Sequence, residues 1–422
     1  MTDLEQQLRL YADWEVNRVE PVSADLILAG DPKTRNSPLA HRPLILTAST
    51  LFVATIIGVV LVLVLDGTVG IPSVRVSSLV VAKVSRTLPL AKMSSVSTWG
   101  PPVSLSAGEG SLWITQGGQG EPPASTTSGG ILRLDPQTLS LSAWAAVAAP
   151  AGTAAANGSV WVVGFTNNMV SRFDTKTGAL LATVTLAPTS GPSPSGPSFS
   201  DGKFLANNVA ASANAVWVTS GRGYVVEIDP STNSVVEEYQ LSPGSPQQLA
   251  VSGNAGWLAA GEQGVALLGP TLPVPDVVPV VVDGRPTFVS AVTVYQGRVW
   301  IAGSILQSDG RGRLTYTNRS FVGVIDSSTG TIRESATTNL RFPKLAVTSD
   351  GLWVTDGQHV ISSVSSESNR RINISPIAML SEAHAASAVV GSGTYVWIID
   401  GADDVMQRVD PRNGVVTPIR IP

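Results

Sequence analysis

One short phrase recurs along most of this chain: an apolar or small residue, a tryptophan and another apolar residue, followed by turn-forming residues. Successive copies lie 40 to 56 residues apart. A period of this size is typical of folds built from many copies of one supersecondary unit. We therefore expect the repeat to determine the fold and its tryptophans to be structural. It contains seven of the ten tryptophans, namely Trp113, Trp161, Trp217, Trp257, Trp300, Trp353 and Trp397.

The copy at residues 208–242 shows the repeat unit most clearly. Turn-forming residues separate its short apolar runs, which predicts four strands joined by hairpins. Four-stranded units of about 40 residues are typical of propeller blades. The seven copies thus predict an all-β, seven-bladed β-propeller of four-stranded blades over residues 99–422. A β-sandwich or a β-helix is the alternative, but sandwich strands repeat less regularly and β-helix repeats are shorter.

An aspartate begins the connection between the third and fourth predicted strands in most copies. Its carboxylate can accept hydrogen bonds from backbone amides two residues on, and a later Gly or Asn suits a left-handed conformation. Such a turn explains the aspartates without a metal or catalytic role. They are Asp135, Asp174, Asp229, Asp326 and Asp410, whereas Gly269 and Ser366 stand at the equivalent place in copies four and six.

Composition excludes several classes of function. The absence of cysteine excludes disulfides, thiolate metal sites and cysteine nucleophiles. Three histidines are too few for a histidine-rich metal centre. A formal net charge of −4 provides no basic field for nucleic acid, so we expect no nucleic-acid partner.

Residues 44–65 form an uncharged apolar stretch that predicts a transmembrane helix. At 1.5 Å per residue, its 22 residues reach roughly 33 Å, enough to cross a hydrocarbon core of about 30 Å. Lys33, Arg35 and Arg42 closely precede the stretch, so the positive-inside rule places the N-terminus in the cytoplasm. The sequence therefore predicts a single-pass protein of the cell membrane with everything after Asp66 outside.

This topology divides the chain into four segments. Residues 1–43 form a cytoplasmic segment with a short amphipathic helix over Asp3–Val16, and residues 44–65 form the transmembrane helix. Residues 66–98 form a stalk with a strand near 78–84 or 86–90, and residues 99–422 form the propeller.

The third copy, VWVTSGRGYVVEIDPSTNSVVEEYQL, resembles the YVTN-type repeat of seven-bladed propellers. The chain is similar over residues 100–422 to YncE-like proteins, virginiamycin B lyase-like proteins and the quinoprotein amine dehydrogenase β-chain-like superfamily. The resemblance implies the fold more than the activity, because such propellers include binding proteins, lyases and lactonases. In the lyase family, His and Glu residues near the channel hold a divalent metal. Here the residue three positions after each tryptophan is never glutamate, so the resemblance does not carry that activity over.

Insertions mark one face of the predicted propeller. From the tryptophan to the turn after the third strand there are 12 or 13 residues in five copies, but 22 and 26 in copies one and five. The extra residues lie within 116–130 and 303–320, and another long connection spans 187–204. Loops after the second strand and loops between blades open on the same side of a propeller. We therefore expect this face to be the working surface.

Charged residues near these loops are the candidate binding residues. An arginine-rich group in the fifth copy could grip a carboxylate, phosphate or sugar, and carboxylates after the last tryptophan could bind calcium. The candidate ligand-binding residues are Arg222, Glu262, Arg311, Arg313, Arg319, Asp356 and His384. The candidate metal ligands are Asp400, Asp403 and Asp404.

Together these features predict a non-catalytic binding module outside the cell membrane. Its expected partners are the membrane, through one helix, and an extracytoplasmic protein, peptide or glycan. Two alternatives stay open: a metal-assisted lyase or hydrolase in the propeller channel, and a transmembrane signal transducer of the anti-sigma type. No cofactor is expected beyond a divalent cation.

Overall fold

The computed structural model describes the propeller with gaps and three short segments that precede it. The predicted cytoplasmic segment, the transmembrane helix and most of the stalk lie outside the described residues. No helix in the described part is long and apolar enough to span a membrane. The chain divides into two units, Met1–Gly70 and Ile71–Pro422, and only the second is described. The described residues are 75–76, 80–81, 83–84, 102–117, 128–165, 168–186, 206–220, 223–241, 247–269, 276–310, 312–326, 331–356, 360–366, 372–379, 386–400 and 405–421.

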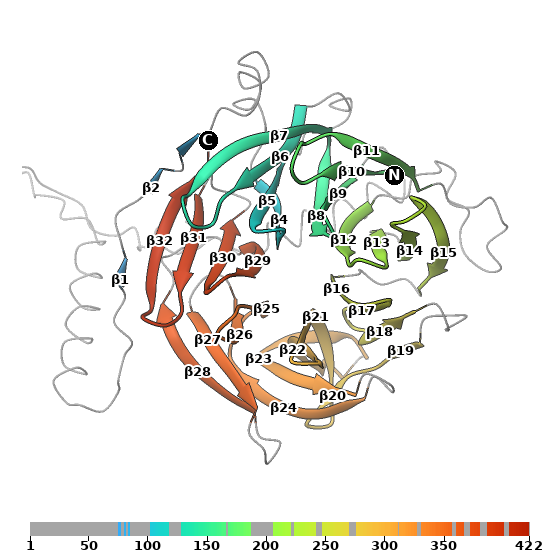
Figure 1. The fold of residues 1–422 in the computed structure, drawn as a ribbon. Helices are drawn as coiled ribbons and strands as arrows, with labels where there is room; N and C mark the ends of the chain where they lie inside the picture. The colour runs from blue at the N-terminus through green and yellow to red at the C-terminus, as the bar shows by residue number, and fades with distance from the viewer. Residues whose placement is uncertain are drawn as a thin grey trace, which may run out of the picture. The chain divides into compact units, whose positions relative to one another are not determined.

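The second unit is a ring of seven sheets (Figure 1). Each blade contains four consecutive antiparallel strands, the first near the centre of the ring and the fourth at the rim (Figure 1). The all-β, seven-bladed prediction is confirmed. Blades one to three are β4 (Pro102–Gly108), β5 (Ser111–Gln116), β6 (Ser128–Leu134) and β7 (Ser140–Ala148); β8 (Pro150–Ala156), β9 (Ser159–Gly164), β10 (Met169–Asp174) and β11 (Leu180–Thr185); and β12 (Ala206–Ala211), β13 (Val216–Ser220), β14 (Tyr224–Asp229) and β15 (Ser234–Gln240).

The remaining blades follow the same pattern, and blade five has one additional short strand. Blade four is β16 (Gln248–Ser252), β17 (Ala255–Ala259), β18 (Val265–Leu268) and β19 (Asp276–Val278). Blade five is β20 (Val281–Val282), β21 (Arg285–Tyr295), β22 (Arg298–Ser308), β23 (Leu314–Ile325) and β24 (Ile332–Thr338). Blades six and seven are β25 (Lys344–Val347), β26 (Leu352–Thr355), β27 (Val360–Ser366) and β28 (Ile372–Met379); and β29 (Ala386–Ser392), β30 (Tyr395–Asp400), β31 (Val405–Asp410) and β32 (Val415–Arg420).

The repeated tryptophan phrase is the interface between blades. Successive side chains of a strand point to opposite faces, so the tryptophan faces one neighbour and its flanking residues face the other. Trp161 of blade two packs with Val216 and Val218, which flank the tryptophan of blade three. The same relation holds around the ring, where every phrase tryptophan is at most 7% exposed. In blade four a glycine, Gly256, replaces one flanking residue, and a Cβ there would lie 3.1 Å from the indole nitrogen of Trp217.

The insertion in blade five continues a hairpin. The strands β22 and β23 extend beyond the blade, pairing Leu306 with Tyr316 and Ser308 with Leu314. Buried side chains at Ile305 and Leu306 anchor its base. Extended β-branched and aromatic residues favour this pairing over an open loop. The hairpin therefore presents fixed side chains on the face that carries the insertions.

Three short strands precede blade one and join it to blade seven. We call them the strap: β1 (Arg75–Val76), β2 (Val80–Val81) and β3 (Lys83–Val84). The first two pair in parallel with β32, and the third pairs in parallel with β7, so the strap extends the rims of both blades (Figure 1). This part of the predicted stalk pairs with the propeller, and of the two strand positions that the sequence offered, 78–84 and 86–90, the first contains β2 and β3. A core cluster in which Trp397 packs with Leu112 and Ile114 closes the ring beneath it.

Candidate functional site

The two faces of the ring differ in construction. We call the face with the connections between third and fourth strands the turn face, and the opposite face, with the hairpin of blade five, the insertion face. On the turn face, the Asp174 carboxylate accepts hydrogen bonds from the backbone amides of Lys176 and Thr177, at 3.0 and 2.7 Å. The Thr177 bond is the main cause of the lowered pKa of Asp174. Gly178 follows with φ of 71°. The predicted turn is confirmed here.

Arginine side chains link neighbouring blades on this face. The guanidinium of Arg172 lies 4.9 Å from the ring centre of Trp161 and donates to the Ser159 hydroxyl at 2.9 Å. It also donates across to blade three, to the Pro230 carbonyl and to the Asn233 side chain, at 2.8 Å for Asn233. The arginine therefore fastens a tryptophan to the aspartate turn of the next blade. Arg133 of blade one makes the equivalent contacts, with Trp113, Ser111 and Thr175.

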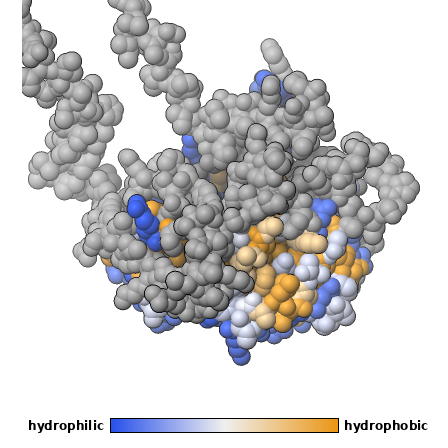
Figure 2. All heavy atoms as spheres, turned by 90° about the horizontal axis from the view of Figure 1, so that it is seen from above, coloured by the Kyte–Doolittle hydropathy of each residue, from blue (hydrophilic) through white to orange (hydrophobic). Residues whose placement is uncertain are grey.

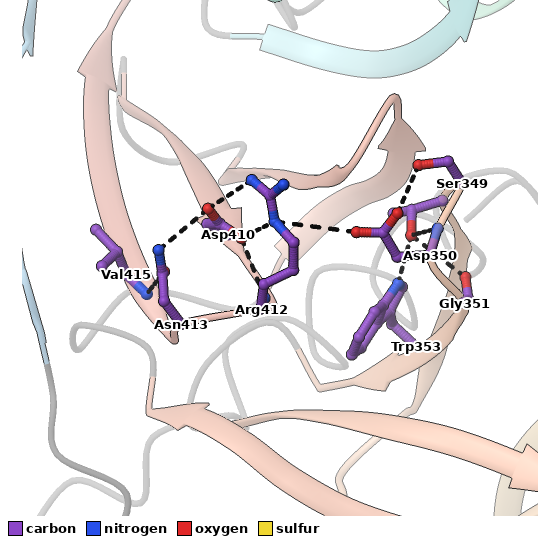
Figure 3. A network of polar contacts seen from close by, with 9 residues as sticks. Ser349, Asp350, Gly351, Trp353, Asp410, Arg412, Asn413 and Val415 are labelled. Carbon is purple, nitrogen blue, oxygen red and sulfur yellow. Dashed lines mark hydrogen bonds and ion pairs between the residues drawn. The ribbon is translucent and has the colours of Figure 1, made fainter.

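Blades six and seven are linked by a polar network on the turn face (Figure 3). Arg412 donates to both carboxylate oxygens of Asp410, at 3.0 and 2.9 Å, and its Nε lies 3.9 Å from a carboxylate oxygen of Asp350 in blade six. The hydrogen bonds from Arg412 lower the pKa of Asp410. Asn413 donates to the same carboxylate at 3.2 Å. Because these carboxylates are engaged within the protein, the network is structural.

The insertion face is organised around a contact between blades four and five. Gly261, in the loop after β17, and Val289 of β21 exchange two backbone hydrogen bonds of 3.2 and 2.9 Å. A Cβ on Gly261 would lie 3.1 Å from the ring of Phe288. This bridge fixes the neighbouring Glu262, an exposed carboxylate, beside the inner strand of blade five.

Three aromatic rings meet next to this bridge. We call Phe288, Tyr316 and Phe342 the aromatic cluster. The ring of Tyr316 lies edge-to-face with Phe288, 5.6 Å between centres, and with Phe342, 5.1 Å between centres. Burial and, to a smaller extent, the nearby charge of Glu262 raise the pKa of Tyr316 to about 12. Tyr316 nevertheless keeps 44% of its surface exposed, so the cluster is open to a ligand.

The arginines of the hairpin have carboxylate partners of their own. Arg313 pairs with Asp309 at 2.9 Å, and Arg319 pairs with Asp283 at 3.3 Å. Each pair is largely exposed, so its contribution to stability is small. Their charges are nevertheless locally compensated. Among the predicted residues, Glu262 lies beside Tyr316, whereas Arg313 and Arg319 lie on the same hairpin as Tyr316 and are already paired with carboxylates.

Of the other predicted site residues, only Asp356 has a described side chain. Asp356 is buried at the end of the second strand of blade six. Asp400 is the last residue of β30, and its side chain is not described. Within the described ranges, no group of three or more His, Cys, Asp or Glu side chains could hold a metal. Five predicted residues lie outside the described part: Arg222, Arg311, His384, Asp403 and Asp404.

Two features of the structure were missed at the sequence level. Phe288 and Phe342 come from separate segments, and nothing in the local sequence marks them as neighbours of Tyr316. The arginine links do have a signal, because in three blades an arginine stands two residues before the turn aspartate. These are Arg133, Arg172 and Arg408.

Comparisons with known proteins support the fold. Neither models of protein families nor curated proteins match the sequence. Among solved structures, the WD40 repeats of RRP9 are 9% identical, with 71% of this chain and 87% of that chain covered and a TM-score of 0.50. A chain of a mitotic checkpoint complex is 12% identical, with 76% and 89% covered and a TM-score of 0.50. A structure of U3-55K is 10% identical, with 71% and 88% covered and the same TM-score. The chain is thus a seven-bladed β-propeller, and similarity at these identities extends to the fold alone.

Proposed function

We propose that this protein is a single-pass membrane protein that displays its propeller outside the cell as a non-catalytic binding module for a protein, peptide or glycan. The observation that carries the binding role is the aromatic cluster. Tyr316 is held by a hairpin longer than any other in the described blades, yet 44% of its surface remains exposed. Exposed aromatic side chains held in place are typical of binding surfaces, because they lose little entropy when a ligand binds.

The construction of the ring supports a binding role for one face in particular. The turn face uses its carboxylates and arginines to hold blades together, as in the Arg412 network (Figure 3). The insertion face instead carries an extended hairpin, whose outer part includes Tyr316 and extends beyond the blade. Propellers host many functions, so the fold by itself leaves the ligand open.

Membrane placement is supported by the sequence. Residues 44–65 are uncharged and long enough to cross a bilayer, and cations precede them. A reporter that is active only outside the cytoplasm, fused after Pro422, should be active, and the same reporter fused before Met1 should be silent. If a reporter that is active only in the cytoplasm is instead active after Pro422, this topology is wrong.

Binding is tested with the purified full chain on peptide and glycan arrays. The variant Tyr316→Ala should lose the ligands that the unchanged chain captures. Phe165→Ala is a matched control, because Phe165 is also aromatic, is 43% exposed and follows a second strand on the same face in blade two. Equal loss in both variants, or in neither, would reject the aromatic cluster as the binding site.

A further inference from the structure

We propose that the aromatic cluster and Glu262 bind the cationic side chain of a basic peptide, a lysine or an arginine. This inference names the ligand class of the site in the proposed function and rests on that function. The three rings come from blade five and from the linker into blade six, whereas the carboxylate comes from blade four. The site therefore depends on the assembled ring.

The ring geometry suits a cation. The planes of Phe288 and Tyr316 meet at 65°, and those of Tyr316 and Phe342 meet at 70°. Such edge-to-face contacts hold the three rings inclined to one another rather than in one flat stack, while Tyr316 stays 44% exposed. The face of an aromatic ring carries negative electrostatic potential, so an exposed ring held in this way attracts an ammonium or guanidinium group.

The charge that acts on Tyr316 has the matching sign. Glu262 is exposed, and no described residue forms an ion pair with it. Its negative charge reaches the Tyr316 hydroxyl, where it helps to raise the pKa. With that pKa at about 12, the phenol of Tyr316 is neutral at physiological pH. The negative charge at the cluster is therefore that of Glu262.

The same charges disfavour the anionic ligand expected from the arginines alone. Arg313 and Arg319 are paired with Asp309 and Asp283, so an incoming anion would have to replace a carboxylate already in place. A cation would instead meet the carboxylate of Glu262, with which no described residue forms an ion pair. A neutral sugar could stack on Tyr316 and donate hydroxyl hydrogen bonds to the carboxylate, but it would gain no attraction between opposite charges. Capture of glycans is therefore the second outcome that the experiment can give.

The test uses the immobilised full chain and pools of random decapeptides. Each pool has one fixed central residue: arginine, lysine, citrulline, acetyl-lysine or glutamate. Arginine and lysine pools should be retained about tenfold better than the citrulline and acetyl-lysine pools, the range expected for a cation on partly desolvated rings. Equal retention of charged and neutral pools, or preference for the glutamate pool, would overturn the inference.

Single substitutions test which side chains cause the preference for basic peptides. Glu262→Gln should weaken retention of the basic pools about threefold and reduce its salt dependence, as for one partly exposed charge. Tyr316→Phe keeps the ring and should retain binding, whereas Tyr316→Ala should lose it. Thermal unfolding of each variant excludes misfolding as the cause. An undiminished affinity in Glu262→Gln would contradict the role of the carboxylate.

The outcomes separate this inference from the proposed function. If Tyr316→Ala loses an acidic peptide or a glycan instead of a basic peptide, the binding surface stands and the cationic ligand is wrong. If Tyr316→Ala still captures every peptide and glycan that the unchanged chain captures, the inference and the proposed binding site both fail.

Discussion

The turn face and the insertion face use aromatic and charged residues in different ways. On the turn face, Arg172 lies on a buried tryptophan and binds the next blade, so its polar groups are used up inside the protein. On the insertion face, Tyr316 is held between two other rings and still keeps 44% of its surface exposed. In this propeller, the polar contacts that join blades and the exposed aromatic side chain of Tyr316 therefore lie on separate faces. Mutations on the two faces should therefore have separable effects.

The largest effect is expected at the phrase tryptophans. Trp161→Ala removes a buried ring from between blades two and three and should lower the free energy of unfolding by about 3–5 kcal/mol. Trp161→Phe fills part of the space and should cost less. Urea unfolding followed by circular dichroism measures both. An unchanged midpoint in Trp161→Ala would show that the phrase does not hold the blades together.

The next effect falls on the other face and on binding. Tyr316→Ala should weaken ligand binding about tenfold or more, as for a central aromatic contact, because it removes the middle ring of the aromatic cluster. Stability should change by less than in Trp161→Ala, since Tyr316 is partly exposed. Titration calorimetry and urea unfolding on the same preparation measure binding and stability. A stability loss as large as that of Trp161→Ala would contradict the expected difference between the faces.

One arginine from each face, Arg172 and Arg313, tests whether their contributions to stability differ. Arg172→Met keeps the aliphatic stem but removes the guanidinium, and should lower the free energy of unfolding by about 1–2 kcal/mol through the lost contacts with Trp161 and Asn233. Arg313→Met removes an exposed pair on the insertion face and should cost about 0.5 kcal/mol or less. Equal losses in urea unfolding would mean that the two faces do not differ in this respect.

The smallest effect is expected in blade three, which is one of the blades without an arginine two residues before the turn. Blade three has Glu227 two residues before its turn aspartate, and this carboxylate is 6% exposed and directly opposite Glu237 in the sheet. Burial, then the charges of Glu237 and Asp229, raise its pKa above 4.5. The folded state thus binds the proton more tightly than the unfolded chain, so this group lowers stability as pH rises from 4.5 through the folded pKa.

Glu227→Gln should therefore stabilise the protein at neutral pH by about 1 kcal/mol, because no buried charge remains. The gain should fade as the pH falls through the folded pKa and should be lost below 4.5, where Glu227 is protonated in both states. Urea unfolding at several pH values measures this dependence. A gain that does not vary with pH would show that the charge of Glu227 is not responsible.

Most of the fold could be predicted from the sequence, because its determinants are local and repeated. The apolar–Trp–apolar phrase specifies both sides of each blade interface, as Trp161 with Val216 and Val218 shows. The aspartate turns are equally local, since Asp174 binds amides two and three residues on. The blade-five insertion was located correctly along the chain, but its extension as a hairpin depends on pairing across β22 and β23.

The candidate site could be predicted only in part. Glu262, Arg313 and Arg319 were selected for their charge and face, and the structure places Glu262 beside Tyr316 and the two arginines on the same hairpin as Tyr316. Phe288 and Phe342 could not be selected, because they meet Tyr316 only after blade five closes against its neighbours. The pairing of Arg319 with Asp283, 36 positions away, likewise depends on the tertiary fold.

The strap has a mechanical consequence. Every blade is complete from its own consecutive strands, so the ring has a seam between blades seven and one that no shared blade strand crosses. The parallel pairs of the strap with β32 and β7 span that seam. Opening the ring there must break one of these pairings as well as the core beneath, so the strap acts as a latch. It also covers part of two rim strands whose free edges would otherwise be available to another chain.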